Sequence, residues 1–327
     1  MAAETPPAEL RLERPVTLHF YGDWGQANLH RVCGWLAQEL GDRAPEGSRF
    51  AIWSGRGGTD AVRAVGRDEV DVALTTPAAF AAAALDGRGR YAGEAFPQLR
   101  ALGSVPQKDR LVLAVSAELD VGSFADLRAR RVPLRIATSP DDGVNHIGLA
   151  VQEIMSRAGI PRATLETWGG GYVEFERPNT CIDAMRDGRA NAVFQEAIMT
   201  PWWRDLADQR ALRFLPIESA VLDALEADYS WPKGTLPAGY LRGLDTTLET
   251  LDFSDFLLLV RADMADDVAH ALAWCLGETR TVLERQYAHL PPERSPVSYP
   301  LVPARMAQTP VPLHPGAARY YREYGHL

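Results

Sequence analysis

Short apolar runs alternate with turns and amphipathic helical patterns along this chain, and no other sequence feature constrains its fold as strongly. The apolar run at 16–21 leads through GDWGQAN to a helical pattern at 29–40. The runs at 50–53 and 70–74 are likewise followed by a turn and a helical pattern. Strands separated by helices pair in parallel, because each helix returns the chain to the same end of the sheet. These residues therefore predict an α/β lobe built on a largely parallel sheet.

A second alternating series begins after residue 130, which indicates a second lobe. Its predicted strands and helices follow one another as in the first lobe, at 134–137 (strand), 147–158 (helix), 165–168 (strand), 179–187 (helix, with Asn179 as N-cap) and 192–194 (strand). The chain then predicts a return strand within 245–260, a helix over 266–282 and an extended, proline-rich tail over 290–315.

Two crossings between the lobes follow from this order. Apolar runs separated by PQKD predict crossing strands near 104–115, and the return strand crosses near 245–260. We expect an N-terminal arm at 1–15, a first lobe formed by 16–110 and 251–327, and a second lobe at 111–250. Ligands of open α/β sheets bind at the carboxyl ends of the strands. The fold class is therefore a two-lobed, type II periplasmic-binding-protein-like α/β fold with a hinge of crossing strands and a ligand cleft between the lobes.

Charge and composition exclude several classes of protein. The 327 residues contain 34 Lys+Arg and 43 Asp+Glu, and the net charge of −9 argues against a surface that follows nucleic-acid phosphates. No run of about 18 apolar residues occurs, so no membrane insertion is expected. Cys33, Cys181 and Cys275 stand far apart, which predicts buried, unpaired thiols.

The first residues contain no cationic segment followed by a long apolar stretch, since charged residues interrupt it from Glu4 to Glu13. We expect a cytoplasmic chain as written, and a periplasmic one if the sequence is that of a processed protein.

Turns at the strand ends of the first lobe carry its candidate ligand-binding residues. The turn after the first strand includes Asp23 and Asn28, and Trp24 could stack on a planar ligand. In the second turn, glycines let the backbone approach a ligand, and the guanidinium of Arg56 can bind a carboxylate with two N–H groups. Ordinary solvated turns are the alternative. The candidates are Tyr21, Trp24, Gln26, Ser54, Arg56, Gly57, Thr59, Thr75 and Thr76.

The second lobe offers a comparable set. The segment SPDDGVNH opens a helix after a strand, and an imidazole there titrates near neutrality. The segment TWGGGY places aromatic rings beside glycines, which suggests a planar or partly apolar ligand, and helix capping or loop flexibility is the alternative. The candidates are Ser139, Asn145, His146, Trp168, Gly170, Tyr172, Gln195 and Glu196.

Five segments carry a resemblance to a known family: DLRARRVPLRIATSPDDGVNHIGLAVQEIMSRAGI, AMRDGRANAVFQEA, PKGTLPAGY, TLETLDFSDFLLLVRADMADDVAHAL and HPGAARYYRE. In order and spacing they resemble the TAXI family of solute receptors for TRAP transporters, although GDWGQAN replaces the family's glycine-rich first turn. The resemblance implies a cleft that closes on a small solute, and TRAP permease subunits as partners if the chain is exported.

Two functions remain open at this point. The first is binding of a small carboxylate by closure of the lobes. The second is an intracellular decarboxylase, lyase or dehydratase in which His146 exchanges protons together with Glu196 or Asp141. No HExxH spacing, P-loop or GxSxG elbow occurs, so neither a metal site nor a cofactor is predicted.

Overall fold

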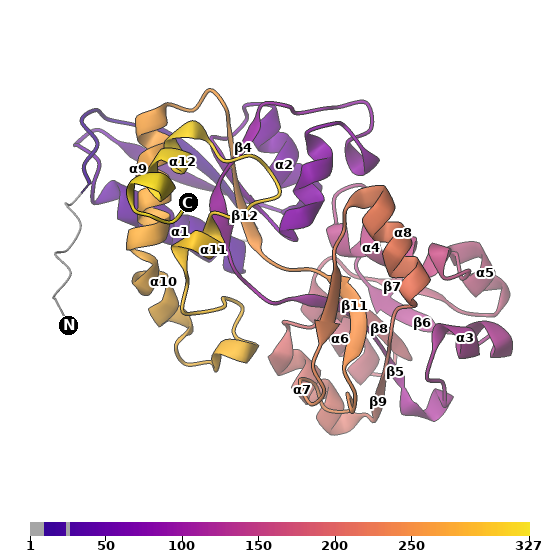
Figure 1. The fold of residues 1–327 in the computed structure, drawn as a ribbon. Helices are drawn as coiled ribbons and strands as arrows, with labels where there is room; N and C mark the ends of the chain where they lie inside the picture. Colours follow the sequence, from indigo (N-terminus) through magenta and orange to yellow (C-terminus); the bar gives the residue numbers. More distant parts are fainter. Residues whose placement is uncertain (1–9, 24–26) are drawn as a thin grey trace.

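The computed structural model describes residues 10–23 and 27–327 and has the predicted two-lobed fold (Figure 1). One sheet has the strand order β2-β1-β3-β12-β4. The other has the order β10-β11-β5-β8-β6-β7, with β9 paired to β5. The strands are β1 (Thr17–Asp23), β2 (Arg49–Gly55), β3 (Val72–Thr75), β4 (Leu99–Val105), β5 (Arg110–Ser116), β6 (Arg135–Thr138), β7 (Gly171–Glu174), β8 (Ala192–Glu196), β9 (Leu212–Leu215), β10 (Lys233–Leu236), β11 (Leu248–Asp252) and β12 (Phe256–Arg261).

Helices cover both faces of each sheet. They are α1 (Asn28–Gly41), α2 (Gly58–Gly66), α3 (Phe124–Arg130), α4 (His146–Arg157), α5 (Arg162–Thr167), α6 (Pro178–Arg186), α7 (Thr200–Gln209), α8 (Ser219–Tyr229), α9 (Asp266–Glu278), α10 (Arg280–Tyr287), α11 (Pro303–Met306) and α12 (Pro315–Glu323). Short 3-10 helices are η1 (Ala78–Ala84), η2 (Gly89–Tyr91), η3 (Ala117–Leu119) and η4 (Pro292–Arg294).

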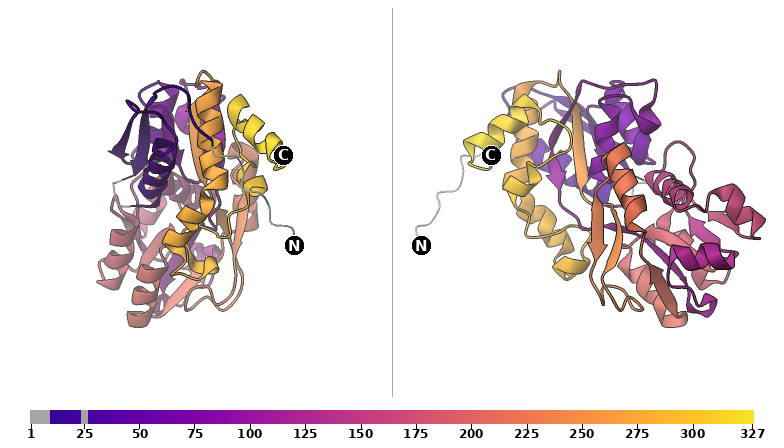
Figure 2. Two further views of the ribbon diagram at one scale, coloured as in Figure 1. Left: turned by 90° about the vertical axis from the view of Figure 1, so that its left-hand side faces the viewer. Right: turned by 45° about the vertical axis from the view of Figure 1, so that its right-hand side comes forward.

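In the first lobe, β1 pairs in parallel with β2 and β3, and β12 runs antiparallel between β3 and β4. Alternate residues of each strand face opposite sides. Thus Phe20 and Leu258 pack into a core with α1 and α9, while Ala73 and Leu257 pack into a separate core with α2. The two views in Figure 2 show α12 lying against α9 on the outside of the lobe. This layering directs the carboxyl ends of β1, β2 and β3 toward the other lobe.

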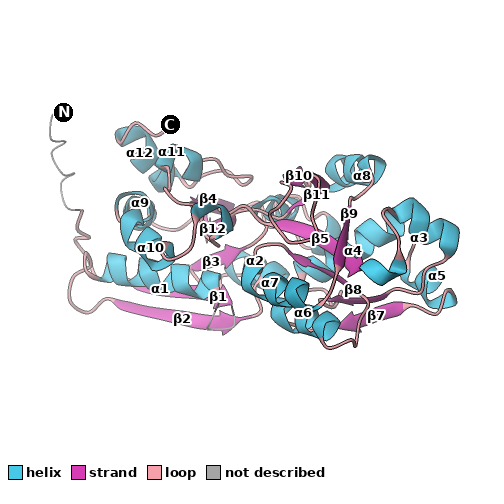
Figure 3. Cartoon of the chain, turned by 90° about the horizontal axis from the view of Figure 1, so that it is seen from below, coloured by secondary structure: helices cyan, strands magenta, loops and turns pink. Residues whose placement is uncertain are grey.

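The second lobe repeats the arrangement with β6, β7 and β8 in parallel and β5 antiparallel to β8. Two buried cores lie on opposite faces of this sheet, one including Phe194 and Ile136 and the other including Val193 and Ala137. Seen from below in Figure 3, α2, α6 and α7 lie in the middle of the molecule, where the lobes meet.

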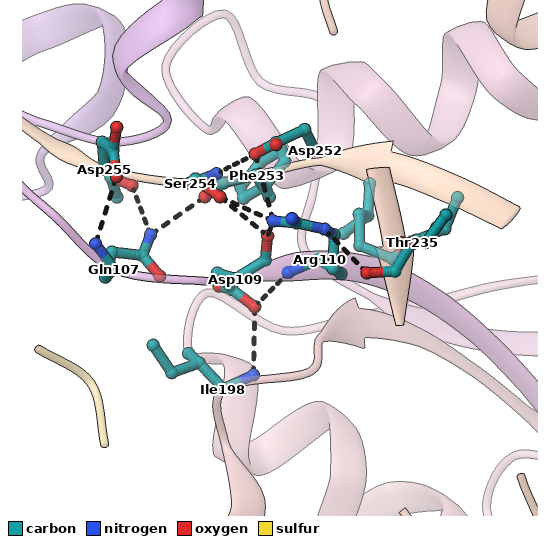
Figure 4. Close-up of polar contacts among 12 residues, drawn as sticks. Gln107, Asp109, Arg110, Ile198, Thr235, Asp252, Phe253, Ser254 and Asp255 are labelled. Carbon is teal, nitrogen blue, oxygen red and sulfur yellow. Dashed lines mark hydrogen bonds and ion pairs between the residues drawn. The ribbon is translucent and has the colours of Figure 1, made fainter. Parts of the chain in front are cut away.

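Two crossing segments, residues 106–109 and 253–255, join the lobes and are bonded to each other (Figure 4). The Phe253 N–H donates to the Asp109 carbonyl at 3.1 Å, and the Arg110 guanidinium donates to the Ser254 hydroxyl at 2.6 Å. The Gln107 N–H donates to the Asp255 carboxylate at 3.1 Å. These bonds hold the two segments together as one hinge.

The strand predicted at 165–168 is wrong: these residues belong mostly to α5, and the strand of this region is β7. The spacing of Leu165 and Trp168 is three residues, which places both on one helix face. Gly169 follows with a φ of +82°, a conformation typical of the residue after a helix.

Other boundaries differ for local reasons. The return strand is split, because Asp255 adopts a φ of +68° between β11 and β12, and these strands belong to different sheets. The helix predicted over 266–282 ends at Glu278, and α10 follows. The N-cap of α6 is Arg177, so Asn179 lies within its first turn after Pro178. The elements α7, α8, β9 and β10 were not predicted.

All three cysteines are free and buried, as predicted. Among residues 10–23 and 27–327, no helix is long and apolar enough to cross a membrane.

Candidate functional site

A cavity of about 440 Å³ lies between the lobes at the carboxyl ends of the strands. Six of the predicted ligand-binding residues line it: Arg56, Gly57, Thr76, Asn145, His146 and Glu196. Asp23 and Asn28 of the first turn also line it. Its wall further includes polar and aromatic side chains that the sequence did not reveal, namely Arg31, Gln107, Asp109, Arg177, Trp202, Phe253, Phe256 and Arg294.

Arg56 lies at the rim of the cavity, but carboxylates of the opposite lobe already occupy it. Its guanidinium forms an ion pair with Asp142, and its Nε donates to Glu176 Oε1 at 3.0 Å. The charge-assisted bond to Arg56 helps to hold the pKa of Asp142 below its usual range. We call Arg56, Asp142 and Glu176 the rim contact. Because Arg56 is already paired, its predicted role in carboxylate binding is not supported. The sequence cannot show which acids face it across the cleft.

Backbone contacts reinforce the rim. The Thr59 N–H donates to the Val144 carbonyl at 3.1 Å, and Gly58 lies so close that a Cβ would stand 2.4 Å from the same oxygen. The loops after β2 and β6 therefore touch, and the structure has the lobes in contact on this side of the cavity.

His146 begins α4 and is 5% exposed. Its Nδ1 lies 2.9 Å from the Thr76 carbonyl. A carbonyl can only accept, so Nδ1 carries the hydrogen and Nε2 is the free acceptor. Burial lowers the pKa of His146 to about 4, so the ring is neutral at pH 7. No contact among the described residues joins His146 to Glu196 or Asp141, and Asp141 instead forms an ion pair with Arg90. The pairs required by the enzyme hypothesis are not assembled.

At the hinge, the cavity is lined by acidic groups. Asp109 is 1% exposed, and its Oδ1 accepts from the N–H groups of Ile198 at 3.0 Å and Arg110 at 2.7 Å (Figure 4). Its carboxyl group lies close to that of Glu196, and burial together with the charge of Glu196 raises the pKa of Asp109. Burial together with the charge of Asp23 raises the pKa of Glu196 to about 7. Asp23 is also buried, which raises its pKa, and its Oδ1 accepts from the His30 N–H at 2.8 Å.

Gln107 completes this end of the cavity and is 2% exposed. Its Nε2 donates to the Phe253 carbonyl at 3.0 Å and contacts the Thr76 hydroxyl at 3.4 Å. Its Oε1 has no donor among the described residues. We call Gln107, Asp109 and Glu196 the hinge end of the cavity.

Two helices of the second lobe begin at the cavity. Neither α6 nor α7 has a side-chain cap at its N-terminus, and residues 177–179 and 199–202 line the wall. The exposed side chain of Arg177, the N-cap residue of α6, has no hydrogen-bond or ion-pair partner among the described residues. A helix N-terminus carries partial positive charge, and a cation beside it strengthens the attraction for an anion.

The remaining predicted site residues lie outside the cavity wall. Trp168, Gly170 and Tyr172 lie at the amino end of β7, where both aromatic side chains pack against the core of the second lobe. They were misplaced because the strand was predicted at 165–168, before its actual position in the chain.

Ser139 and Gln195 bond to each other at 3.0 Å beneath the wall. Tyr21 packs over Gly55, Ser54 is exposed, Thr59 is buried, and the Thr75 hydroxyl contacts the Gly58 carbonyl. Trp24 and Gln26 lie outside the described residues.

The missed residues share a cause. Gln107 and Asp109 lie within PQKD, a segment that the sequence marked as a crossing but not as part of a site. Trp202 belongs to α7, which was not predicted. In the part of the chain that the structure describes, no cluster of His, Cys, Asp and Glu is arranged to hold a metal ion.

Comparisons with known proteins agree with this architecture. The NMT1-like family matches residues 36–325. A structure described as a periplasmic transporter matches with a TM-score of 0.55 and 12% identity, covering 96% of this chain and 95% of the other. A TctC solute-binding protein from Polaromonas matches with a TM-score of 0.50 and 12% identity, covering 96% and 99%. No curated protein matches the chain.

Proposed function

The chain belongs to the NMT1-like family, and we propose that it is a solute-binding protein that holds a small organic carboxylate in the cavity between its lobes. One observation carries the proposal: the cavity lies at the carboxyl ends of both sets of parallel strands, with two uncapped helix N-termini and Arg177 at its wall. This is where ligands of open α/β sheets bind.

The carboxylate is assigned to the α6 and α7 side of the cavity. Arg56 is already paired with two carboxylates, whereas Arg177 is available to form a new charge-assisted bond. The ligand's apolar part then contacts the side chains of Ile147, Ile198 and Phe253. Because residues from both lobes line the cavity, a bound solute stabilises the closed arrangement.

Calorimetric titration with acetate, glutarate and citrate, alongside matched alcohols, tests the carboxylate assignment. Arg177→Ala should weaken the binding of a carboxylate by about 10-fold or more, the usual effect of losing a bond to a charged group. Arg204→Ala is the matched control, since Arg204 is an exposed arginine on α7 outside the cavity wall. Tight binding of the alcohols, with no effect of Arg177→Ala, would refute the assignment.

We further propose a TAXI-type role in transport, with TRAP permease subunits as partners. The five segments quoted above support it, and the two similar structures are those of a periplasmic transporter and a TctC solute-binding protein. Receptor function of this kind requires export to the periplasm, and the alternative is that the chain stays in the cytoplasm. Fractionation of cells that express the native gene decides between these locations: mature chain in the periplasm supports the transport role, and chain confined to the cytoplasm contradicts it.

A further inference from the structure

At the hinge end of the cavity, one buried hydrogen-bond acceptor has no donor among the described residues. This acceptor points to a second feature of the solute. Gln107 Oε1 is a buried acceptor with no donor among residues 10–23 and 27–327. A buried acceptor left without a partner costs about 1–3 kcal/mol, so native structures usually supply one.

The orientation of the Gln107 amide is fixed by its neighbours. The group that faces the Phe253 carbonyl at 3.0 Å must be a donor, because a carbonyl oxygen only accepts. Nε2 therefore occupies that position, and Oε1 is turned away from the Ser254–Phe253 segment, as Figure 4 shows. Exchanging the two atoms would remove the bond to Phe253 and place two oxygens against each other.

The neighbours of Gln107 on the cavity wall are also acceptors. Asp109 uses Oδ1 to accept from two backbone N–H groups, and its carboxyl group faces Glu196. Asp23 adds a third carboxyl group to the wall. Phe253 and Phe256 also line the cavity, and aromatic rings attract cations that approach their faces. Arg110, the arginine nearest in sequence, does not supply the missing donor, because it is directed to Asp252, Ser254 and the Thr235 carbonyl.

We propose that the hinge end binds an ammonium group of the solute, with Gln107 Oε1, Glu196 and Asp109 as its acceptors. This inference rests on the proposed function, and it makes the ligand a zwitterion: its carboxylate lies toward α6 and α7, and its ammonium group lies toward the crossing segments. An ammonium group has three N–H donors, and Gln107 Oε1 together with the oxygens that the Asp109–Glu196 pair leaves free can accept them.

The test compares carboxylates that differ by one amino group: 4-aminobutyrate against butyrate, L-alanine against propionate, and L-glutamate against glutarate. Methylammonium and tetramethylammonium serve as fragments that do not depend on the length of the solute. The amino member of a pair should bind about 10- to 100-fold more tightly, the range expected for a hydrogen bond to a charged group. Methylammonium should shift the side-chain amide resonances of Gln107, and tetramethylammonium, which has no N–H donor, should not.

Two variants assign the effect to the hinge end. Glu196→Gln keeps the shape but removes the charge, and it should reduce the preference for the amino member to less than about 3-fold. Gln107→Leu should do the same. Gln98→Leu is its matched control, because Gln98 also donates to a backbone carbonyl, that of Gly66, outside the cavity. Circular dichroism of each variant establishes that it is folded, and Glu196→Gln is the variant to use if Gln107→Leu is not.

The outcomes separate the two proposals. Equal or tighter binding of the amine-free carboxylates overturns the ammonium site and leaves the solute-binding function standing. Binding of methylammonium without any carboxylate supports the ammonium site and overturns the carboxylate assignment. If neither the paired compounds nor methylammonium binds, the ammonium site is wrong and the carboxylate proposal loses its support.

Discussion

The rim contact and the hinge end lie on the same cavity but treat their charges in opposite ways. At the rim, Arg56 meets Asp142 and Glu176 from the other lobe, so the charge of Arg56 is already paired within the protein. At the hinge end, Asp109 is buried and Glu196 half-buried, both with raised pKa values, and Gln107 Oε1 lacks a donor among the described residues. The rim contact, whose cation is already paired, joins the lobes, whereas the hinge end, which has an unpartnered acceptor, is suited to a ligand.

The largest effect should come from breaking the hinge end at Asp109. Asp109→Ala removes the acceptor for the Ile198 and Arg110 N–H groups, and we expect the free energy of unfolding to fall by about 2–4 kcal/mol. Asp109→Asn keeps an oxygen at this position and should cost less than about 1 kcal/mol. Urea unfolding at pH 7 measures both. Equal losses of unfolding free energy in the two variants would show that the Asp109 oxygen does not stabilise the fold as a hydrogen-bond acceptor.

The pH dependence of stability tests the environment of His146. Its pKa is about 4 in the folded chain, below the ordinary value of 6.5, so between these values the unfolded chain binds the extra proton. Stability from this group is present above pH 6.5 and lost as the pH falls toward 4, by on the order of 1–3 kcal/mol. His146→Gln should remove this part of the slope. Unfolding curves at pH 5 and pH 7.5 should therefore differ less in the variant, and an unchanged slope would contradict the burial of a neutral imidazole.

Glu196 should behave with the opposite sign. Its folded-state pKa is raised above the unfolded value, so its contribution to stability is present at low pH and lost as the pH rises through the raised pKa. Glu196→Gln removes this loss, and we expect the variant to be more stable than the native chain at pH 8 by about 1–2 kcal/mol. Thermal unfolding at pH 5 and pH 8 provides the measurement, and a variant that is less stable at pH 8 would contradict a buried carboxylate pair.

The smallest effect should come from the rim. The side chain of Arg56 is 37% exposed, so its ion pairs are screened by solvent, and Arg56→Ala should reduce the free energy of unfolding by less than about 1 kcal/mol. It should instead expand the ligand-free protein, which small-angle scattering detects. A loss of stability as large as that of Asp109→Ala would erase the distinction between the two ends of the cavity.

Much of the fold could be predicted from the sequence because periodicity is local. The apolar runs that became β1, β2, β3 and β8 alternate with helical patterns, and hydrophobic burial alone makes that pattern stack into α/β layers. The strand predicted at 165–168 failed because four residues are too few to establish a period, and the position of the strand depended on pairing between β6 and Gly171–Glu174.

The candidate site shows the same difference between what is local in the sequence and what depends on tertiary structure. Gly57, Thr76, Asn145, His146 and Glu196 were found because they follow strands, and the chain order places strand ends at the cleft. Charge pairing was decided only in three dimensions: nothing near Arg56 in sequence shows that Asp142 and Glu176 will face it. Likewise, in the sequence Gln107 and Asp109 belong to a short polar segment between two predicted strands. Only the crossing of the chain buries them beside Glu196 and leaves Gln107 Oε1 without a donor among the described residues, because desolvation depends on what packs around a group and not on its neighbours in sequence.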